Sequence, residues 1–469
     1  MAQIRSTEGY ITFFTAVILS AVIALTGVLQ RSADARALQL EAGHAAAKQL
    51  EITLSLYDRD LWDRYGLHGL AEESVSVEVL HEMLPAITRS ELSAEGVSSV
   101  WDPVILETGI GSFMKTRLTA AYFSVLYTRL KTMLNLGEPQ KTGAASRMSN
   151  ATTGMDVSEL QRLIDAYYTH REDILGASRL DGEETEETDS LTEIALAGAD
   201  VAELDDFLNG NQGGLNLDTS KLQEAVDGLS GILVYLQAPA GGVYSYLSLR
   251  EYPLGMLSHA VSRQEEASSL APNRGFNLRG YEMAADTDLK PLQAEEIITG
   301  SENRSSAEAG LKRRLTALRI LFNLLGISMN EGRMQRYYNQ AAIISGIILV
   351  LSLGNLSVPP EAIQGGLILA AAWRLSRQDR DKLLRGSAVP LLPFQDRQTE
   401  FPTVYEDYLR LLLLTLDTGT LLARTSKILR RNMGGKDYYA GIKINIDSSE
   451  GLSKQISYTQ RYMAYESAE

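Results

Sequence analysis

The sequence predicts a mainly α-helical protein with minor β structure, which starts with a transmembrane helix and ends with a β-hairpin. Residues 10–29 carry no charged side chain and are largely apolar. Apolar residues then recur at helical spacing through much of the chain. Near the C-terminus, Ile442, Ile444 and Ile446 alternate with other residues at the two-residue period of a strand. Together these patterns place the chain in the α+β class.

Composition narrows the function classes. The chain has 469 residues, 45% of them hydrophobic and 22% charged, which excludes a wholly disordered protein. It contains no Cys, which excludes disulfides, thiolate metal sites and cysteine nucleophiles. The formal charge of −15 disfavours nucleic acid as a partner.

The first element, residues 1–30, is predicted to be an N-terminal segment and membrane anchor. An apolar helix of about 20 residues is roughly 30 Å long, which matches the hydrocarbon core of a bilayer. The alternatives are a buried core helix and a cleaved signal peptide, but the apolar stretch is long and helix-forming sequence follows it directly. The expected lipid-facing residues are Tyr10, Phe13, Phe14, Ile18 and Leu25.

Small residues in the anchor suggest a helix-packing face. Ala16, Ser20, Ala24 and Gly27 follow the spacing that lets transmembrane helices approach closely. Ordinary membrane composition explains the same pattern, so both interpretations stay open.

Residues 31–66 are predicted to continue as a long juxtamembrane helix. No Pro occurs between Met1 and Met83. The end of this region is dense in aromatic and charged residues, and Gly66 suits a helix C-terminus. Its acids are more typical of a solvated helix end than of a metal site, because arginines neutralise them. The motif residues are Tyr57, Asp58, Arg59, Asp60, Tyr65 and Gly66.

Two regions follow before the helical core. Residues 67–171 are predicted to be a mixed helical region, with a short strand over 75–79, helices over 113–136 and 157–175, and a linker-like stretch over 137–155. Residues 172–220 are predicted to be an acidic linker, because residues 172–206 hold thirteen acids and one Arg, a local charge of −12. A Ca²⁺ site is the alternative, although residues 209–218 lack the closing Glu of a Ca²⁺ loop.

Residues 221–436 are predicted to be a helical core, and residues 437–469 a β-hairpin tail. Within the core we expect helices over 221–237, 306–325 and 405–431 and a strand over 241–249. Two further apolar segments, 341–353 and 362–373, predict an αα-hairpin. The first segment is too short to span a bilayer alone, and a membrane hairpin is the alternative.

Several motifs resemble a known family. These are the run from Gly9 to Phe14, the anchor and the helix that ends in the aromatic motif, together with residues 366–373 and 405–413. They are similar to uncharacterised, membrane-anchored TadE/TadG-like (pseudopilin-like) proteins of Gram-positive bacteria, encoded with Tad-type pilus or secretion machinery. Prepilin-type proteins are cut after a Gly and usually have Glu as fifth mature residue, whereas cutting after Gly9 would place Phe14 there. The resemblance therefore implies a minor or accessory subunit.

No catalytic motif is present in the sequence. The five His residues lie far apart, and zinc-protease, nucleophile-elbow, phosphate-loop and dinucleotide motifs are absent. We therefore expect no enzyme activity, cofactor, metal site or small-molecule substrate. The predicted function is a membrane-anchored structural or assembly component of a Tad-type pilus or secretion apparatus.

The predicted partners are the lipid bilayer and other membrane-anchored pilus or secretion subunits, without nucleic acid. We expect a single-pass protein of the cell membrane, with a cytoplasmic N-terminus and an extracellular body. One alternative is an anchored extracellular binding or sensing protein that depends on Ca²⁺ through its acidic block. The second is an anchored hydrolase whose catalytic residues are dispersed in the sequence.

Overall fold

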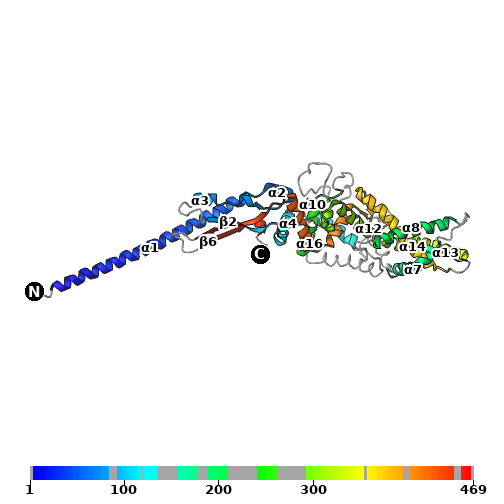
Figure 1. Ribbon diagram of the computed structural model, residues 1–469, viewed down its shortest axis with the longest axis horizontal. Coiled ribbons are helices and arrows are strands. Elements are labelled where there is room, and N and C mark those ends of the chain that lie inside the picture. The colour runs from blue at the N-terminus through cyan, green and yellow to red at the C-terminus, as the bar shows by residue number, and fades with distance from the viewer. Residues whose placement is uncertain are drawn as a thin grey trace. The chain divides into compact units, whose positions relative to one another are not determined.

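The fold is mainly α with minor β, as predicted (Figure 1). The computed structural model describes residues 4–83, 92–118, 120–134, 157–177, 188–209, 240–261, 292–352, 356–394, 401–447 and 456–465. The chain divides into two compact units. The first, here called the terminal unit, comprises Met1–Phe113 and Thr425–Glu469, and the second, the central unit, comprises Met114–Arg424.

The terminal unit is built on one long helix, α1 (Ile4–Ser55). A second short helix, α2 (Arg59–Tyr65), follows after a turn. The prediction of a single helix through residue 66 is therefore wrong over its last part. The physical reason is Asp58, whose side chain accepts a hydrogen bond from the Leu61 backbone N–H at 2.8 Å and caps a new helix.

An antiparallel sheet lies beside the second half of α1 (Figure 1). Its central strand, β5 (Tyr438–Ile446), pairs with β1 (Leu70–Ala71), β2 (Leu92–Ser99) and β6 (Ile456–Arg461). The β5–β6 pairing, with Ile446 opposite Ile456, confirms the predicted C-terminal hairpin. Strands β1 and β2 were not expected from the sequence.

The predicted strand over 75–79 is wrong. Residues 72–74 form a short 3₁₀ turn, and α3 (Glu78–Met83) follows. Val75 and Val77 alternate because both pack partly against the core between α1 and the sheet, without strand pairing.

The core of the terminal unit lies between α1 and the sheet. Four α1 residues face three isoleucines of β5, and all seven are buried. The α1 residues are Ala42, Ala45, Ala46 and Leu50, and the β5 residues are Ile442, Ile444 and Ile446. Because three of the four helix residues are alanines, the helix axis lies close to the strands. The unit is completed by α4 (Pro103–Arg117).

The central unit is helical, and its helices correct several predicted boundaries. Within the described residues, the helix predicted over 113–136 is divided between α4, which ends at Arg117, and α5 (Ala120–Leu134). The helix predicted over 405–431 is divided into α15 (Tyr405–Leu414) and α16 (Thr418–Asn432). The other helices are α7 (Val157–Ala177), α8 (Thr188–Asn209), α10 (Ala240–Met256), α11 (Gln293–Thr299), α12 (Arg304–Ser328), α13 (Glu331–Leu351) and α14 (Pro360–Leu384). A two-strand ladder joins β3 (Val389–Pro390) and β4 (Pro402–Thr403).

The predicted αα-hairpin is present as part of α13 and α14, which pack together. Trp373 on α14 is buried in the central unit. Residues 241–249 belong to α10, so the predicted strand is wrong. The alternation of apolar and polar residues over 241–249 suggested a strand. Val243 and Leu247, which are buried, also satisfy the four-residue spacing of a helix.

The acidic region is more ordered than predicted. Residues 188–209 form α8, and the carboxylates of Asp200 and Glu203 pair with Arg374 and Arg377 of α14. Arginines on a neighbouring helix thus compensate charges that the sequence places in a linker. The predicted linker over 137–155 and helix over 221–237 lie outside the described residues, as does most of the 209–218 candidate Ca²⁺ loop.

Two buried ionic clusters tie the central helices together. Arg319 of α12 donates to Asp379 of α14 at 2.5 Å and to the Tyr408 hydroxyl at 2.7 Å. Arg410 of α15 donates to Glu251 of α10 at 2.8 and 3.0 Å. Each cation has its carboxylate partner, which offsets much of the cost of burying both charges.

Candidate anchor and helix-packing site

The first half of α1 lies free of the sheet and exposes apolar side chains (Figure 1). Every residue from Phe13 to Asp34 is exposed, and the Phe13 side chain is 70% exposed. Among the predicted lipid-facing residues, Phe14, Ile18 and Leu25 are also exposed, and Tyr10 lies within the helix. An apolar surface of this extent favours contact with lipid or another apolar helix.

Among the described residues, this is the one helix long and apolar enough to cross a membrane. Its length and composition fit a membrane anchor, and a signal sequence shares these properties. The residues predicted to form the anchor are therefore continuous with the helix that carries the sheet.

Two polar side chains in this segment, Ser20 and Thr26, are satisfied within the helix. The Ser20 hydroxyl donates to the Val17 carbonyl at 2.9 Å, and the Thr26 hydroxyl to the Val22 carbonyl at 2.9 Å. A bilayer offers no water to hydrogen-bond a polar group, so such groups must find partners in the protein. These bonds to preceding carbonyls meet that requirement without a partner helix.

The segment presents two contrasting faces. At about 100° per residue, Ala16, Ser20, Ala24 and Gly27 fall within roughly a quarter turn of one another. All four are exposed, and no atom lies within 4 Å of the position that a Cβ on Gly27 would take. The same geometry places larger residues on the opposite face, namely Ile18, Val22, Leu25 and Leu29. The small-residue face would let another helix approach closely.

The aromatic motif after α1 forms a structural corner. Besides capping α2, Asp58 accepts a hydrogen bond from the Tyr438 hydroxyl of β5 at 3.0 Å. Tyr65 is buried, and Gly66 ends α2 with a left-handed φ of 66°. A Cβ at Gly66 would overlap the Phe113 ring, so glycine is required for two reasons.

The other two charged residues of the motif face solvent. Arg59 and Asp60 are exposed, and the Asp60 carboxylate lies 3.8 Å from Arg64. The part of the chain that the structure describes holds no cluster of three or more His, Asp or Glu side chains suited to a metal ion. The motif joins the end of α1 to the sheet through the hydrogen bond between Asp58 and Tyr438.

An aromatic stack lies behind this corner. His68 stacks on Trp62 with ring centroids 4.2 Å apart, and on Tyr462 at 5.4 Å. Burial lowers the pKa of His68 below its usual value, so the neutral imidazole is favoured in the fold.

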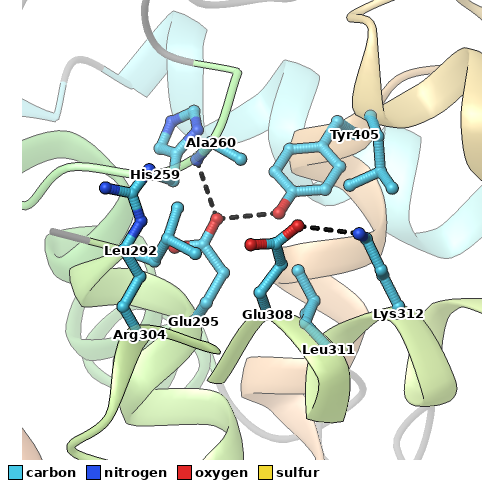
Figure 2. Close-up of a pocket in the computed structure, with 10 residues that line it drawn as sticks. His259, Ala260, Leu292, Glu295, Arg304, Glu308, Leu311, Lys312 and Tyr405 are labelled. Atoms are coloured by element: carbon cyan, nitrogen blue, oxygen red, sulfur yellow. Dashed lines mark hydrogen bonds and ion pairs between the residues drawn. The ribbon is translucent and has the colours of Figure 1, made fainter. Parts of the chain in front are cut away.

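A separate cavity of about 270 Å³ lies in the central unit (Figure 2). Acidic, basic and apolar residues line it. These are His259, Ala260, Leu292, Glu295, Arg304, Glu308, Leu311, Lys312, Leu384 and Tyr405. The Glu295 carboxylate accepts hydrogen bonds from the Ala260 backbone N–H at 2.8 Å and from the Tyr405 hydroxyl at 2.7 Å. Burial raises the pKa of Glu295 and that of Tyr405.

No family model, curated protein or solved structure matches this chain.

Sequence reasoning located the long apolar helix but missed the cavity. His259, Glu295 and Tyr405 come from a turn, α11 and α15, which are far apart in sequence. No local spacing links them. Glu295 has a second acid, Glu296, beside it in the sequence, so nothing local distinguished it as a buried group.

Proposed function

We propose that this protein is a membrane-anchored, pseudopilin-like structural or assembly component, and a minor subunit, of a Tad-type pilus or secretion apparatus. The observation that supports the proposal best is the division of α1 into two halves. The first half exposes an apolar surface, and the second half is buried against an antiparallel sheet. Such a helix holds a folded domain at the membrane while leaving its anchor available to other helices.

The proposed mechanism is lateral packing of anchors through the small-residue face. Ala16, Ser20, Ala24 and Gly27 are the contact residues in this proposal, and the bilayer and other membrane-anchored pilus or secretion subunits are its partners. Two features support it. The Ser20 and Thr26 hydroxyls are satisfied within the helix, and the opposite face offers large side chains to lipid.

Cysteine crosslinking tests the mechanism directly, because the native chain contains no Cys and gives a clean background. Ser20→Cys and Ala24→Cys place a thiol on the small-residue face. Ile18→Cys and Leu25→Cys are the matched controls on the opposite face of the same helix. With a maleimide-linked benzophenone, which on illumination inserts into C–H bonds of a neighbouring helix, we expect crosslinked partners in native membranes from the first pair only.

Equal crosslinking from both faces, or none from either, contradicts packing through this face. Mass spectrometry of the crosslinked species then tests the assembly role. Recovery of pilus or secretion subunits supports the proposal, and recovery of copies of this chain alone contradicts a minor subunit among other proteins.

We further propose a cytoplasmic N-terminus and an extracellular body in the cell membrane. A thiol at exposed Met463 should react with a membrane-impermeant maleimide on intact cells. A thiol at Thr7, on the other side of the apolar segment, should react only after the cells are lysed. The reverse labelling pattern contradicts this orientation, and release of the body from the membrane contradicts an uncleaved anchor.

A further inference from the structure

The cavity of the central unit holds a carboxylate that is only half satisfied. Glu295 is fully buried, with 0% of its surface exposed. Its Oε1 atom accepts both hydrogen bonds, from Ala260 and from Tyr405. Its Oε2 atom is also buried and has no hydrogen-bond partner in the described part of the chain. Because a buried polar atom without a partner costs about 1–3 kcal/mol, this oxygen favours a ligand that donates a hydrogen bond.

The same cavity carries one cation without a partner in the described structure. Arg304, at the start of α12, lines the cavity and forms no ion pair or hydrogen bond with the described residues (Figure 2). Lys312 differs, because its ammonium pairs with Glu308 at 2.7 Å, one helical turn away. The available charges are therefore one negative group inside the cavity and one positive group on its wall.

The remaining wall is apolar and the volume is small. Leu292, Leu311 and Leu384 also line the cavity. Its volume of about 270 Å³ lies just below the range of roughly 300–1,000 Å³ typical of drug-sized ligands. This space suits a molecule smaller than a drug, with a short apolar stem.

We propose that this cavity binds a small zwitterion of the amino-acid type. Its ammonium group donates to Glu295 Oε2, and its carboxylate accepts from the Arg304 guanidinium. A ligand with a carboxylate alone would be repelled by the Glu295 carboxylate. A ligand with an amine alone would leave the Arg304 guanidinium without an anionic partner. A lone divalent cation fits poorly, because the cavity offers one open carboxylate oxygen, whereas Ca²⁺ takes six to eight oxygen ligands. This inference does not depend on the proposed assembly role.

Calorimetric titration of the full-length protein in detergent micelles tests the proposal. The probes are glycine, β-alanine and γ-aminobutyrate, which vary the distance between the two charges. Ethylamine and propionate each carry one of the charges. We expect at least one zwitterion to bind ten-fold or more tightly than both single-charge probes. Absence of binding by all three zwitterions at millimolar concentration overturns the proposal, as does equal binding of propionate.

Two variants assign the contacts. Glu295→Gln keeps an oxygen for the Ala260 and Tyr405 donors but removes the charge, and should weaken zwitterion binding ten-fold or more. Arg304→Gln changes an exposed position and should weaken it similarly. Glu331→Gln, at an exposed position in the first turn of α13, is the matched control and should bind as the native chain does. Native affinity in either cavity variant overturns the assigned contacts.

Discussion

The division of α1 into a free half and a packed half predicts very different costs for the same substitution at two positions. Leu40 and Leu50 lie ten residues apart on the same helix, and their side chains are 68% and 4% exposed. Leucine to alanine changes helix propensity equally at both positions, so that contribution cancels in the comparison. Only the lost packing differs.

The expected magnitude follows from burial. Leu50→Ala removes a side chain from the core beneath β5 and leaves a cavity, which costs about 3 kcal/mol. Leu40→Ala changes an exposed side chain and should cost about 0.5 kcal/mol or less. A difference of about 2.5 kcal/mol corresponds to a factor of roughly 70 in the equilibrium between closed and open states.

Hydrogen exchange of the β5 amides, measured by mass spectrometry on the full chain in detergent, reports this equilibrium locally. We expect exchange over residues 438–446 to accelerate about a hundred-fold in Leu50→Ala and hardly at all in Leu40→Ala. Equal acceleration in both variants would refute packing of α1 through one half only. Slow exchange in both would show that the sheet is stable without this helix.

Three further predictions concern the corner, the buried charges and pH. Gly66→Ala should destabilise the chain by more than Gly434→Ala in urea unfolding, by about 1 kcal/mol or more, because both positions have positive φ but only the first lacks space for a Cβ. Arg410→Met should cost about 3–5 kcal/mol by leaving Glu251 buried without its cation, and adding Glu251→Leu should recover part of that loss. If the two single costs simply add in the double variant, the pair is not coupled. The folded pKa of His68 lies below its unfolded value near 6.5, so the fold binds this proton less well than the unfolded chain. The contribution of His68 to the free energy of unfolding is therefore fully present above about pH 6.5 and is lost as the pH falls towards the folded pKa. His68→Phe should remove this acid-side loss from thermal melts between pH 7.5 and 5, and an unchanged profile would contradict it.

The features that sequence predicted well have strong local signals. The apolar N-terminal helix, its continuation as far as Ser55 and the C-terminal hairpin each follow from periodicity within one segment. The position of the α1 end was missed, because the second partner of Asp58, the Tyr438 hydroxyl, comes from a strand 380 residues further along the chain. The sequence around Asp58 reads equally well as continuous helix.

The features that sequence predicted poorly depend on distant partners. Arg129 reads as part of a solvated basic face, yet its guanidinium pairs with Asp407 at 2.5 Å. Arg319 lies in the helix predicted over 306–325, where nothing in the sequence distinguishes it from the neighbouring basic residues, and it is completely buried. Such charges are placed by helices that meet only in the folded chain, so no spacing reveals them. The Glu295 cavity was missed for the same reason.

The continuity of α1 also fixes the direction from which a neighbour can reach the anchor. At about 100° per residue, the alanines that meet the sheet project within roughly a quarter turn of the small-residue face. Ala42 lies about 23 Å along the axis from Gly27, at 1.5 Å per residue. A straight partner helix that packs on the small-residue face and runs parallel to α1 would thus meet the sheet. A partner with a short or absent ectodomain could therefore lie level with α1 on that face without meeting the sheet.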